Sequence, residues 1–434
     1  MSVQPVKGTH DLYGLDAAKN VYVREIFRQM SELYGFHEMN LPVLEYTEVF
    51  ARGTGESSDI VRKEMYTFLD KGNRSVTMRP EFTAGVMRAI VSDKLYATED
   101  LPLKIYYEGP AFRYERPQLG RYRQFTQFGV EAVGLDNALA DAETILLAIH
   151  SFKMLGFKNL TLKVNTLGDS ETRKAYREAL KGYFSKHIDA MCTDCHERLN
   201  LNPMRILDCK VPEDQEIAKD APKIKDYLSE ESEKRFYKTL SVLADAEIDY
   251  EVDDSLVRGL DYYSEVVFEI HAKSEEGHDY GALCGGGHYS GLVRDFGGPE
   301  LSGVGFAIGV DRIVSLMEEL DLFPDLGEGI DVYVMPIGET MVETAFALVT
   351  TIRAYGYKAE TPLQSGKLGS FFKKATRRGA RFALILGEDE LNRGVAQLKD
   401  LSSQEQKEIR LDHLEETLDE LLNAEEEHHH DHKE

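Results

Sequence analysis

The chain has 434 residues, of which 42% are hydrophobic, and it carries a formal net charge of −25 at pH 7. This length and apolar content suffice for two or three domains with buried cores and exclude an intrinsically disordered chain. The first twenty residues lack the apolar segment of a secretory signal, and no run approaches the ~18 apolar residues of a membrane helix, so we expect a cytoplasmic protein without membrane spans. The four cysteines are too few for a disulfide framework.

The first two thirds of the chain mix helical and extended patterns. Residues 17–34 carry apolar side chains at helical spacing and end before Gly35, which predicts a helix with a glycine cap. The segment FHEMNLPVLEY is expected to be extended, with Pro42 at an edge or a break in pairing. Further strands are predicted at Ser75 to Met78, Leu103 to Phe112, Gln124 to Val133, Thr161 to Asn165, Tyr262 to His271 and Leu301 to Ile308, and helices at Asp141 to Leu155 and Asp311 to Leu320. Consecutive strands that include a hairpin favour an α+β fold with a largely antiparallel sheet.

Two segments divide this pattern into domains. A highly charged, mostly helical segment lies between two of the strands, and we expect it to be an insertion. The stretch LDLFPDLGEG has the composition of a linker, and strands alternate with helices after it, as in a small α/β domain. The predicted domains are 1–169 with 236–325, the helical insertion 170–235, the α/β domain 326–424 and an acidic, histidine-rich tail 425–434.

Strand alternation places polar side chains around glycines. In FTQFGVEAV, Gln127 and Glu131 face the same way with only Gly129 between them. A bare backbone flanked by an amide and a carboxylate suits a small polar ligand that lies against a sheet. In VTMRPEFTA, alternation groups Thr77, Arg79, Glu81 and Thr83 on one side. Each residue taken singly is better explained as an exposed strand position, and only their repetition beside glycines indicates a site.

The stretch VRGLDYYSEVVFEI is rich in β-branched and aromatic residues and predicts a strand from Tyr262. Alternation assigns to the core face Tyr262, Val266, Phe268 and Ile270, and to the solvent face Tyr263, Glu265 and Glu269. The run ALCGGGHYSGLVRDFGG allows a chain or ligand to approach closely, but it matches neither a P-loop nor a dinucleotide-binding pattern. In GVGFAIGVDRI a strand passes into a helix with Arg312 in its first turn, where a cation is disfavoured unless it has a negative or aromatic partner or points to solvent.

Two further clusters leave their role open. Cys192 and Cys195 form a CxxC pair with Cys209 further along, which could hold zinc, although the fourth ligand is unclear. The HHHDH sequence near the end is better explained as a frayed tail than as a metal site. The run GKLGSFFKKATRRGAR is basic without any acid, and it is explained equally well as a solvated helix surface and as a phosphate-binding face.

Four motifs occur in a fixed order along the chain: PVKGTHDLYG, FRYERPQLGRYRQFTQFGVEAVG, LVRGLDYYSEVVFEI and GVGFAIGVDRI. Their order and spacing resemble those of histidyl-tRNA synthetases, which are class II aminoacyl-tRNA synthetases, over nearly the whole chain. The RGLDYY segment, with QFGVE before it, separates the histidine enzymes from other class II members, whereas the strand-to-helix passage ending in Arg312 is common to the class. The resemblance implies a six-stranded antiparallel sheet flanked by helices, a helical insertion, a C-terminal α/β domain that binds the anticodon, and a homodimer formed partly through the segment around Pro42.

The implied activity is that of a histidine–tRNA ligase. ATP, accompanied by Mg²⁺, would activate L-histidine to histidyl-adenylate with release of pyrophosphate, and the histidyl group would pass to the 3′-terminal ribose of tRNA(His). The basic run then becomes part of the tRNA-facing surface, through Lys373, Lys374, Arg377 and Arg378.

The same resemblance assigns roles to individual residues. ATP would be bound by Arg113 and Arg258 at the α-phosphate and by Arg312 over the adenine and near the γ-phosphate; the residues expected to be catalytic are Arg113, Arg258 and Gln127. The α-amino group of histidine would contact Glu81, Thr83 and Gln127, and its imidazole would lie in a pocket with Glu131, Tyr263, Tyr262 and Tyr289. Strict alternation puts Arg258 on the face of Tyr262, so these roles require the backbone to turn or bulge at Gly259 and Leu260.

Some positions depart from the family pattern. His10 and His288 stand where the family usually has arginine, and Ser290 stands where aspartate is usual, which puts charge-based roles at positions 10 and 288 in doubt. One alternative is the non-catalytic, synthetase-like regulatory subunit of ATP phosphoribosyltransferase, which generally lacks the anticodon domain and degrades the phosphate-contacting motifs. Both Arg113 and Arg258 are present here. Another alternative is a class II enzyme for a different amino acid. Glu131 and Tyr263 argue against it, because an apolar substrate would have no use for them.

Overall fold

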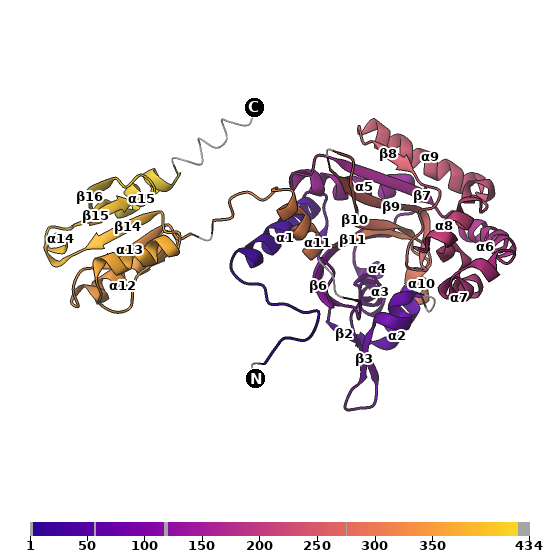
Figure 1. Ribbon diagram of the computed structural model, residues 1–434, viewed down its shortest axis with the longest axis horizontal. Coiled ribbons are helices and arrows are strands. Elements are labelled where there is room, and N and C mark those ends of the chain that lie inside the picture. The colour runs from indigo at the N-terminus through magenta and orange to yellow at the C-terminus, as the bar shows by residue number, and fades with distance from the viewer. Residues whose placement is uncertain (1–2, 56–57, 117–119, 275, 328, 424–434) are drawn as a thin grey trace. The chain divides into compact units, whose positions relative to one another are not determined.

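The computed structural model describes residues 3–55, 58–116, 120–274, 276–327 and 329–423 (Figure 1). Two compact units divide the chain: unit 1, Met1–Pro324, and unit 2, Asp325–Glu434. The predicted tail, 425–434, and residues 117–119 of the second motif lie outside the described residues. Within the described ranges, no helix has both the length and the apolar character needed to cross a membrane.

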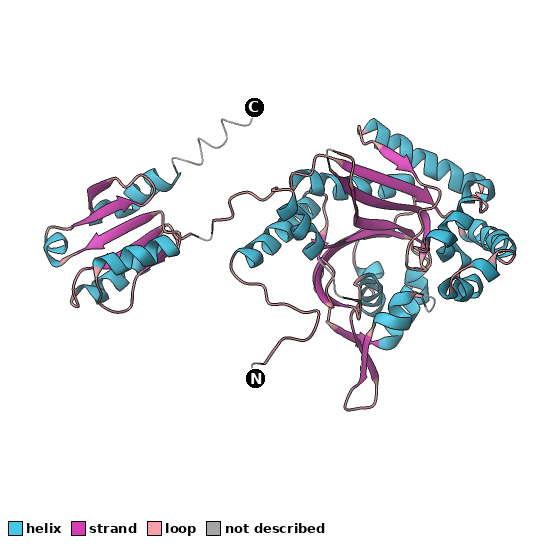
Figure 2. Cartoon of the chain, in the orientation of Figure 1, coloured by secondary structure: helices cyan, strands magenta, loops and turns pink. Residues whose placement is uncertain are grey.

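Unit 1 is built around an eight-stranded sheet in the order β1-β5-β6-β11-β10-β9-β7-β8 (Figure 2). Its strands are β1 (His37–Glu38), β5 (Leu103–Phe112), β6 (Gln124–Val133), β7 (Leu160–Thr166), β8 (Tyr250–Val252), β9 (Tyr263–Lys273), β10 (Asp279–Tyr289) and β11 (Gly303–Gly309). Only the short edge strands β1 and β8 pair in parallel. The six strands between them are antiparallel, so the predicted antiparallel α+β fold is confirmed.

Helices cover one face of this sheet. They are α1 (Leu15–Leu33), α5 (Ala138–Met154), α9 (Glu230–Asp245) and α11 (Val310–Glu319). Their apolar sides meet alternate strand residues such as Phe128, Phe268 and Ile270, all fully buried in one core. Each such aromatic or aliphatic side chain contributes about 1.5–3 kcal/mol through burial. Because these residues use only one side of each strand, the other side of the sheet is left for polar groups.

Smaller elements frame the second face. A three-stranded sheet has the order β2-β4-β3 and consists of β2 (Leu44–Tyr46), β3 (Tyr66–Leu69) and β4 (Ser75–Met78). The helices on this side are α2 (Thr47–Thr54), the π-helix η1 (Ile60–Glu64), α3 (Thr83–Ser92), α4 (Leu95–Thr98) and α10 (Leu292–Asp295). Apolar residues of α3 and α10 pack on the β5 residues Ile105 and Tyr107. The helices thus close one end of a depression on the sheet.

The segment predicted as an insertion is helical. It contains α6 (Ser170–Phe184), η2 (Ile188–Ala190), α7 (Thr193–Leu201), η3 (Pro203–Ile206), α8 (Pro212–Lys219) and η4 (Ile224–Tyr227), and it leads into α9. Its core includes Tyr176, Leu180 and Cys195 and extends to Tyr263 and Val267 of β9. The helical segment therefore packs directly against the strand that follows the RGLDYY motif.

Strand β10 was not predicted from the sequence. It contains the three consecutive glycines of ALCGGGHY, which have low intrinsic strand propensity, yet it lies between β9 and β11 and pairs with both. A Cβ atom on Gly286 would overlap the Gly305 carbonyl oxygen and the Phe268 ring. Glycine is therefore required there by close packing, and tertiary contacts override the local preference.

The start of β9 differs from strict alternation. The chain turns through Gly259 to Tyr262, as the roles of Arg258 and Tyr263 required, and the strand begins only at Tyr263. Tyr262 precedes the strand, so its predicted place on the core face is wrong. The prediction that Glu265 lies on the solvent face is also wrong. The strand bulges at this residue, whose φ is 47°, and its carboxylate accepts a hydrogen bond from the Ser232 hydroxyl of α9.

Unit 2 is a small α/β fold, as its alternating pattern predicted. Its sheet has the order β13-β12-β14-β15-β16, parallel through β14 and antiparallel beyond it. The strands are β12 (Val332–Pro336), β13 (Ala359–Glu360), β14 (Phe382–Leu386), β15 (Val395–Asp400) and β16 (Gln406–Arg410). The helices are α12 (Met341–Ala354), α13 (Leu368–Arg377), α14 (Glu388–Asn392), η5 (Leu411–His413) and α15 (Leu414–Asn423). It has its own buried core around Val334, Val349 and Leu384.

Candidate active site

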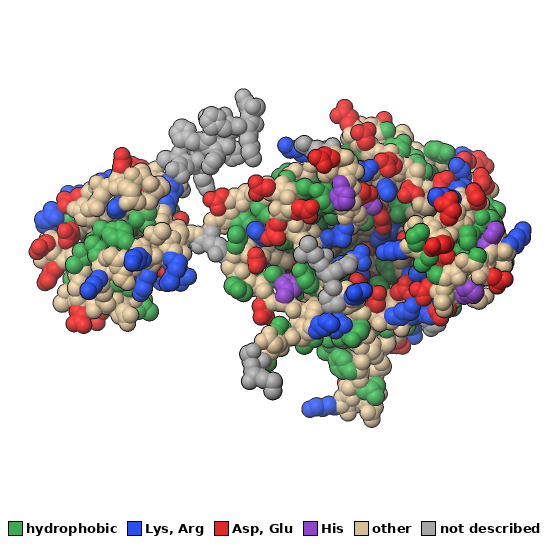
Figure 3. All heavy atoms as spheres, in the orientation of Figure 1, with side chains coloured by type: hydrophobic (Ala, Val, Ile, Leu, Met, Phe, Trp, Pro, Cys, Tyr) green, Lys and Arg blue, Asp and Glu red, His purple; other side chains and the backbone are tan. Residues whose placement is uncertain are grey.

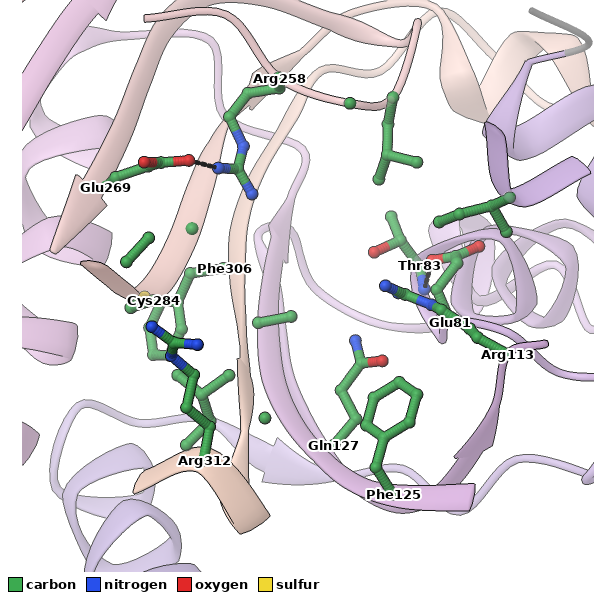
Figure 4. Close-up of a pocket in the computed structure, with 18 of the residues that line it drawn as sticks. Glu81, Thr83, Arg113, Phe125, Gln127, Arg258, Glu269, Cys284, Phe306 and Arg312 are labelled. Carbon is green, nitrogen blue, oxygen red and sulfur yellow. Dashed lines mark hydrogen bonds and ion pairs between the residues drawn. The ribbon is translucent and has the colours of Figure 1, made fainter. Parts of the chain in front are cut away.

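A cavity of about 460 Å³ lies on the sheet face away from the main helices of unit 1 (Figure 4). Residues of β6, β9, β10 and β11 line it, together with the start of α3 and of α11. Its floor contains Gly285 and Gly305, where a Cβ atom would overlap the Arg258 guanidinium and the Glu131 carboxylate respectively. The glycines therefore give these two charged groups room to lie across the sheet.

Glu131 forms the polar centre of one end of the cavity. Its Oε1 accepts hydrogen bonds from the Thr83 hydroxyl at 2.6 Å and the Tyr107 hydroxyl at 3.2 Å, and its Oε2 accepts one from Tyr289 at 2.8 Å. The residue is only 2% exposed, and burial raises the pKa of its carboxyl to about 7 despite these donors. A buried carboxyl that titrates near neutral pH can recognise a ligand that itself carries N–H groups.

Tyrosines complete this end. Tyr263 is buried, and its ring lies 4.6 Å from that of Tyr262, which in turn packs edge-on against Tyr289 at 5.7 Å. Burial raises the pKa of all three phenols, so they stay neutral. The subsite therefore offers aromatic faces, neutral hydroxyls and one carboxyl, which suits a small aromatic heterocycle.

Glu81 lies just ahead of α3. Its carboxylate accepts the backbone N–H groups of Thr83 at 2.6 Å and Ala84 at 3.1 Å, and it is 3% exposed. Burial raises its pKa, and the two N–H donors oppose that rise. Glu81 is thus fixed by the helix terminus while it lines the cavity.

The strand alternation predicted for this segment is wrong beyond Met78. Strand β4 ends there and α3 begins at Thr83, so Glu81 and Thr83 reach the cavity from a helix start. Arg79 instead donates to the carbonyl oxygens of Leu41 at 2.7 Å and Pro110 at 2.8 Å. Thr77 hydrogen-bonds Thr67 of β3 and Thr47 at the start of α2. Neither residue lines the cavity.

Of the arginines that line the cavity, Arg113, Arg258 and Arg312 come from separate elements (Figure 4). Arg113 follows β5, donates to the Pro80 carbonyl at 2.8 Å and lies 5.3 Å from the Phe125 ring. Arg258 comes from the turn before β9 and pairs with Glu269. Arg312 donates to the Tyr280 carbonyl at 2.6 Å, so its partner is a backbone oxygen, which was not among the alternatives that the sequence left open.

Several polar atoms of the residues that line the cavity have no hydrogen-bond partner. Among the described residues, the buried Nε atoms of Arg258 and Arg312 have no hydrogen-bond partner, and neither has the Oε1 of Gln127. Burial and the nearby Arg121 lower the pKa of Arg312. Arginine N–H groups without an acceptor favour the binding of an anion. A side-chain carbonyl oxygen without a donor, such as that of Gln127, favours a ligand that carries an N–H group.

The structure brings together all ten residues that the sequence assigned to histidine and ATP: Glu81, Thr83, Arg113, Gln127, Glu131, Arg258, Tyr262, Tyr263, Tyr289 and Arg312 line one cavity. Sequence reasoning gave no role to Glu269, although alternation placed it on the face of Tyr263. Its pairing with Arg258 depends on the turn at Gly259, which no local pattern specifies. Arg121 and Glu115 of the arginine-rich loop also line the cavity and were not singled out.

The two histidines that replace arginines lie apart from this set. His288 is 1% exposed and points to the opposite face of β10, where its Nδ1 lies 2.8 Å from Arg235 and 3.1 Å from Asp141. The ring of His10 lies 4.2 Å from that of Tyr122, and its Nε2 is 3.8 Å from Asp311. Neither lines the cavity, although Tyr122, which His10 contacts, does.

Comparison with known proteins agrees with this geometry. The family model described as histidyl-tRNA synthetase matches residues 8–313, and the model described as anticodon binding domain matches residues 331–421. The chain belongs to the histidyl-tRNA synthetase family. It is 47% identical over 411 residues to the histidine–tRNA ligase of Anoxybacillus flavithermus, covering 95% of this chain and 97% of that one. It is 45% identical to that of a Geobacillus species over 422 residues, covering 97% and 100%.

A solved structure of the same family is similar throughout. The apo histidyl-tRNA synthetase of S. aureus superposes with a TM-score of 0.82 at 35% sequence identity, covering 96% of this chain and 100% of that one. The fold that the motifs implied is therefore that of the family, a class II synthetase sheet followed by an anticodon-binding domain.

Two clusters lie outside the cavity of this synthetase. Lys373, Lys374, Arg377 and Arg378 stand on or just after α13, and all except Lys374 are exposed. Figure 3 shows basic side chains gathered on that face of unit 2. In unit 1, Cys192, Cys195 and Cys209 converge with Asp214 within the helical segment.

Proposed function

We propose that the cavity of unit 1 performs both chemical steps of the family's reaction. The enzyme is a histidine–tRNA ligase: ATP and L-histidine yield histidyl-adenylate and pyrophosphate, and the histidyl group then passes to the 3′-terminal ribose of tRNA(His) with release of AMP. The observation that supports this placement best is the mixed polarity of the cavity, in which a buried carboxyl and phenols lie together with arginines that are partly unpaired.

The carboxyl end suits histidine. An imidazole between Glu131 and Tyr263 could donate one ring N–H to the carboxylate and use its other nitrogen with the phenol, whereas an apolar ring of similar size would leave both groups unpaired. The Oε1 of Gln127 is a free acceptor for the α-ammonium group, and Glu81 adds charge complementarity. The Thr83 hydroxyl, bonded to Glu131, links the two subsites.

The cavity arginines suit the ATP phosphates. Charge builds on the α-phosphate as the histidine carboxylate oxygen attacks phosphorus and the bond to pyrophosphate breaks. We assign Arg113 and Arg258 to that phosphate, because fixed guanidinium groups stabilise developing charge without reorganising. Arg312 would lie over the adenine and near the γ-phosphate, since a planar cation can stack and donate at the same time.

Magnesium would accompany the nucleotide. Mg²⁺ prefers oxygen ligands, and the cavity offers the carboxylates of Glu115 and Glu269, which lie beside Arg113 and Arg258 respectively. These residues fit such an ion, which would offset phosphate charge when bound.

The remaining assignments follow the predicted domains. We propose that residues 1–169 and 236–325 form the catalytic domain, 170–235 the insertion and 326–424 the anticodon-binding domain, with the α13 cations contacting tRNA phosphates. Residue 235 falls inside α9, so α9 would belong to both catalytic domain and insertion. A cytoplasmic location, as expected for this synthetase, also stays a prediction.

We also propose a homodimer that uses the small sheet near Pro42. Its side chains Leu44, Tyr46 and Phe68 are each at least 46% exposed, which is unusual for neighbouring large apolar groups. A partner surface of the same kind would bury them symmetrically.

The first experiment is ATP–pyrophosphate exchange with each amino acid, on the wild type and on Arg258→Ala. We expect exchange with histidine alone and its loss in the variant, because Arg258 would hold the α-phosphate during attack. Arg294→Ala, an exposed arginine outside the cavity, is the matched control and should exchange normally. Absence of exchange with every amino acid would instead favour the regulatory paralogue.

A further inference from the structure

Three cysteines and one aspartate meet in the helical segment of unit 1, away from the catalytic cavity. Cys192 immediately precedes α7, Cys195 lies in its first turn, Cys209 lies between η3 and α8, and Asp214 lies in the first turn of α8. One donor atom from each of the four lies within 4.8 Å of every other. Asp214 is the residue that the sequence pattern did not reveal, because its carboxylate joins the cysteines only when the first turn of α8 lies beside the start of α7.

We propose that Cys192, Cys195, Cys209 and Asp214 bind one structural zinc ion. The Sγ atoms of Cys192 and Cys209 are 3.8 Å apart. Two thiolates at about 2.3 Å from one tetrahedral zinc stand at about that separation. The Asp214 Oδ2 lies 3.2 Å from Cys209 Sγ, close enough to complete the same coordination sphere. Four ligand atoms this close enclose a single ion and leave no room for a multi-iron cluster.

The surroundings favour a cation at this point. Asp214 and Cys195 are fully buried and Cys209 is 3% exposed. Within the described part of the chain, no lysine, arginine or histidine forms an ion pair with Asp214, whose contacts are the Cys192 backbone N–H and the Cys209 thiol. A buried carboxylate without a cationic partner is costly, and metal coordination is one of the usual ways to offset that cost.

The ligand types select the metal. Thiolate ligands favour zinc over magnesium or calcium, and four protein ligands without an open position are typical of structural zinc. The starts of α7 and α8 both face the cluster, so the positive ends of two helix dipoles would offset the negative charge of the thiolates. Three thiolates and one carboxylate thus form a closed site with suitable electrostatics.

Such an ion would brace the wall of the cavity. The segment between Cys195 and Cys209 contains Arg205, which donates to Asp59 at 2.8 Å, and both residues line the cavity. It also contains Asn202, which donates to Asp261 at 2.9 Å in the turn between Arg258 and Tyr263. Zinc would therefore tie the helical segment to the turn that positions Arg258.

The decisive test measures metal in the full chain, purified without an affinity tag. His428, His429, His430 and His432 are replaced by Gln so that the tail cannot contribute. We expect one zinc per chain by elemental analysis, released as one equivalent when a mercurial reagent modifies the thiols. After exchange with Co²⁺ we expect the sulfur-to-cobalt charge-transfer band and the intense visible bands of a tetrahedral thiolate site. Because this chain keeps all four ligands, the result does not depend on whether ligand variants fold.

Ligand variants then test the individual residues. Cys195→Ser, Cys209→Ser and Asp214→Asn should lose zinc and melt at lower temperature, because binding energy in such sites is also folding energy. The matched controls Cys284→Ser, which removes the cysteine outside the cluster, and His196→Gln, which changes an exposed neighbour on α7, should each keep one zinc. Zinc retention with an unchanged cobalt spectrum in Asp214→Asn would overturn the proposed fourth ligand. A chain that neither contains nor takes up zinc, that contains iron instead, or that is purified with a Cys192–Cys209 disulfide would overturn the site.

Discussion

At the scale of single residues, the cavity depends on polar groups that are buried and already constrained. Glu131 accepts three hydroxyl hydrogen bonds before any substrate binds, and Glu81 accepts two backbone N–H groups. These carboxylates do not need to change position when histidine binds, and this increases the selectivity for histidine over other amino acids. Their burial also has measurable consequences for stability.

Glu131 should make stability depend on pH. Burial raises the pKa of its carboxyl to about 7 in the folded chain, above its ordinary value of 4.5. Between these pH values the folded state keeps a proton that the unfolded state has released, so the free energy of unfolding falls as pH rises. The Glu131→Gln variant has no titratable group at this position, so its free energy of unfolding lacks this contribution to the pH dependence. From about pH 5 to about pH 8 we expect the wild type to lose about 2–3 kcal/mol more than this variant.

Urea denaturation of both proteins across this pH range measures the difference. Other titrating groups are shared by the two chains and cancel in the comparison. If the two pH profiles run parallel, Glu131 does not carry the shifted pKa.

Gly285 should matter for catalysis more than for folding. A Cβ atom there would overlap the end of the Arg258 side chain, which is flexible and can move at low cost in stability. Arg258 would then leave its place at the cavity floor. We expect Gly285→Ala to melt within a few degrees of the wild type and to lose at least about tenfold in histidine-dependent exchange, or about 1.4 kcal/mol of transition-state stabilisation.

Gly182→Ala is the matched control, since a Cβ on this α6 glycine meets open space and should leave exchange unchanged. Full exchange activity in Gly285→Ala would mean that the observed position of Arg258 is not the one used in the reaction.

At the scale of elements, α13 is the best candidate for binding RNA phosphates in unit 2. It concentrates cations, although the chain as a whole carries −25. Replacing Lys373, Lys374, Arg377 and Arg378 by Ala should raise the KM for tRNA and leave pyrophosphate exchange unchanged. If all four contact phosphates, the slope of log affinity against log salt should fall by about 3.

The control for α13 is a second set of four exposed cations in unit 2, Lys358, Arg393, Lys407 and Arg410, which gives the same change in net charge. Equal losses of tRNA affinity in both sets would point to overall charge and not to α13 as the cause.

On the small sheet β2-β4-β3, Leu44, Tyr46 and Phe68 share one face and are exposed in a single chain, whereas Leu69 points to the other face. We expect the double change Leu44→Asp and Phe68→Asp to shift the protein from dimer to monomer in sedimentation equilibrium, because two buried charges would be unpaired in the interface. Tyr237→Asp, at an exposed aromatic position on α9, is the control and should stay dimeric. If the wild type sediments as a monomer, the proposed homodimer is wrong.

At the scale of the whole molecule, the two units have separate buried cores and are joined near Pro324. Adenylate formation needs only the cavity of unit 1, whereas tRNA selection would also use unit 2. We therefore expect a chain ending at Pro324 to keep histidine-dependent exchange within about threefold and to lose at least about tenfold in kcat/KM for tRNA charging. Loss of exchange in a folded unit 1 would show that the cavity depends on unit 2.

The sequence by itself determined the strand hairpin β5–β6, the cavity-facing set on β6, the strand-to-helix passage before Arg312 and the α/β order of unit 2. These features follow from periodicities of two and 3.6 residues, which are local properties of the chain. Resemblance to the family added the roles of the ten cavity residues.

Tertiary structure decided what no local pattern contains. Strand β10 forms because its glycines fit between Phe268 and Gly305, against their own propensity. Glu265 leaves its expected face because the strand bulges against α9, and Glu81 reaches the cavity from a helix start that alternation could not anticipate. Asp214 joins the three cysteines only because the fold brings the first turn of α8 beside the start of α7. In each case the deciding contact joins residues whose proximity depends on the folded chain, so its energy is absent from any short window of sequence.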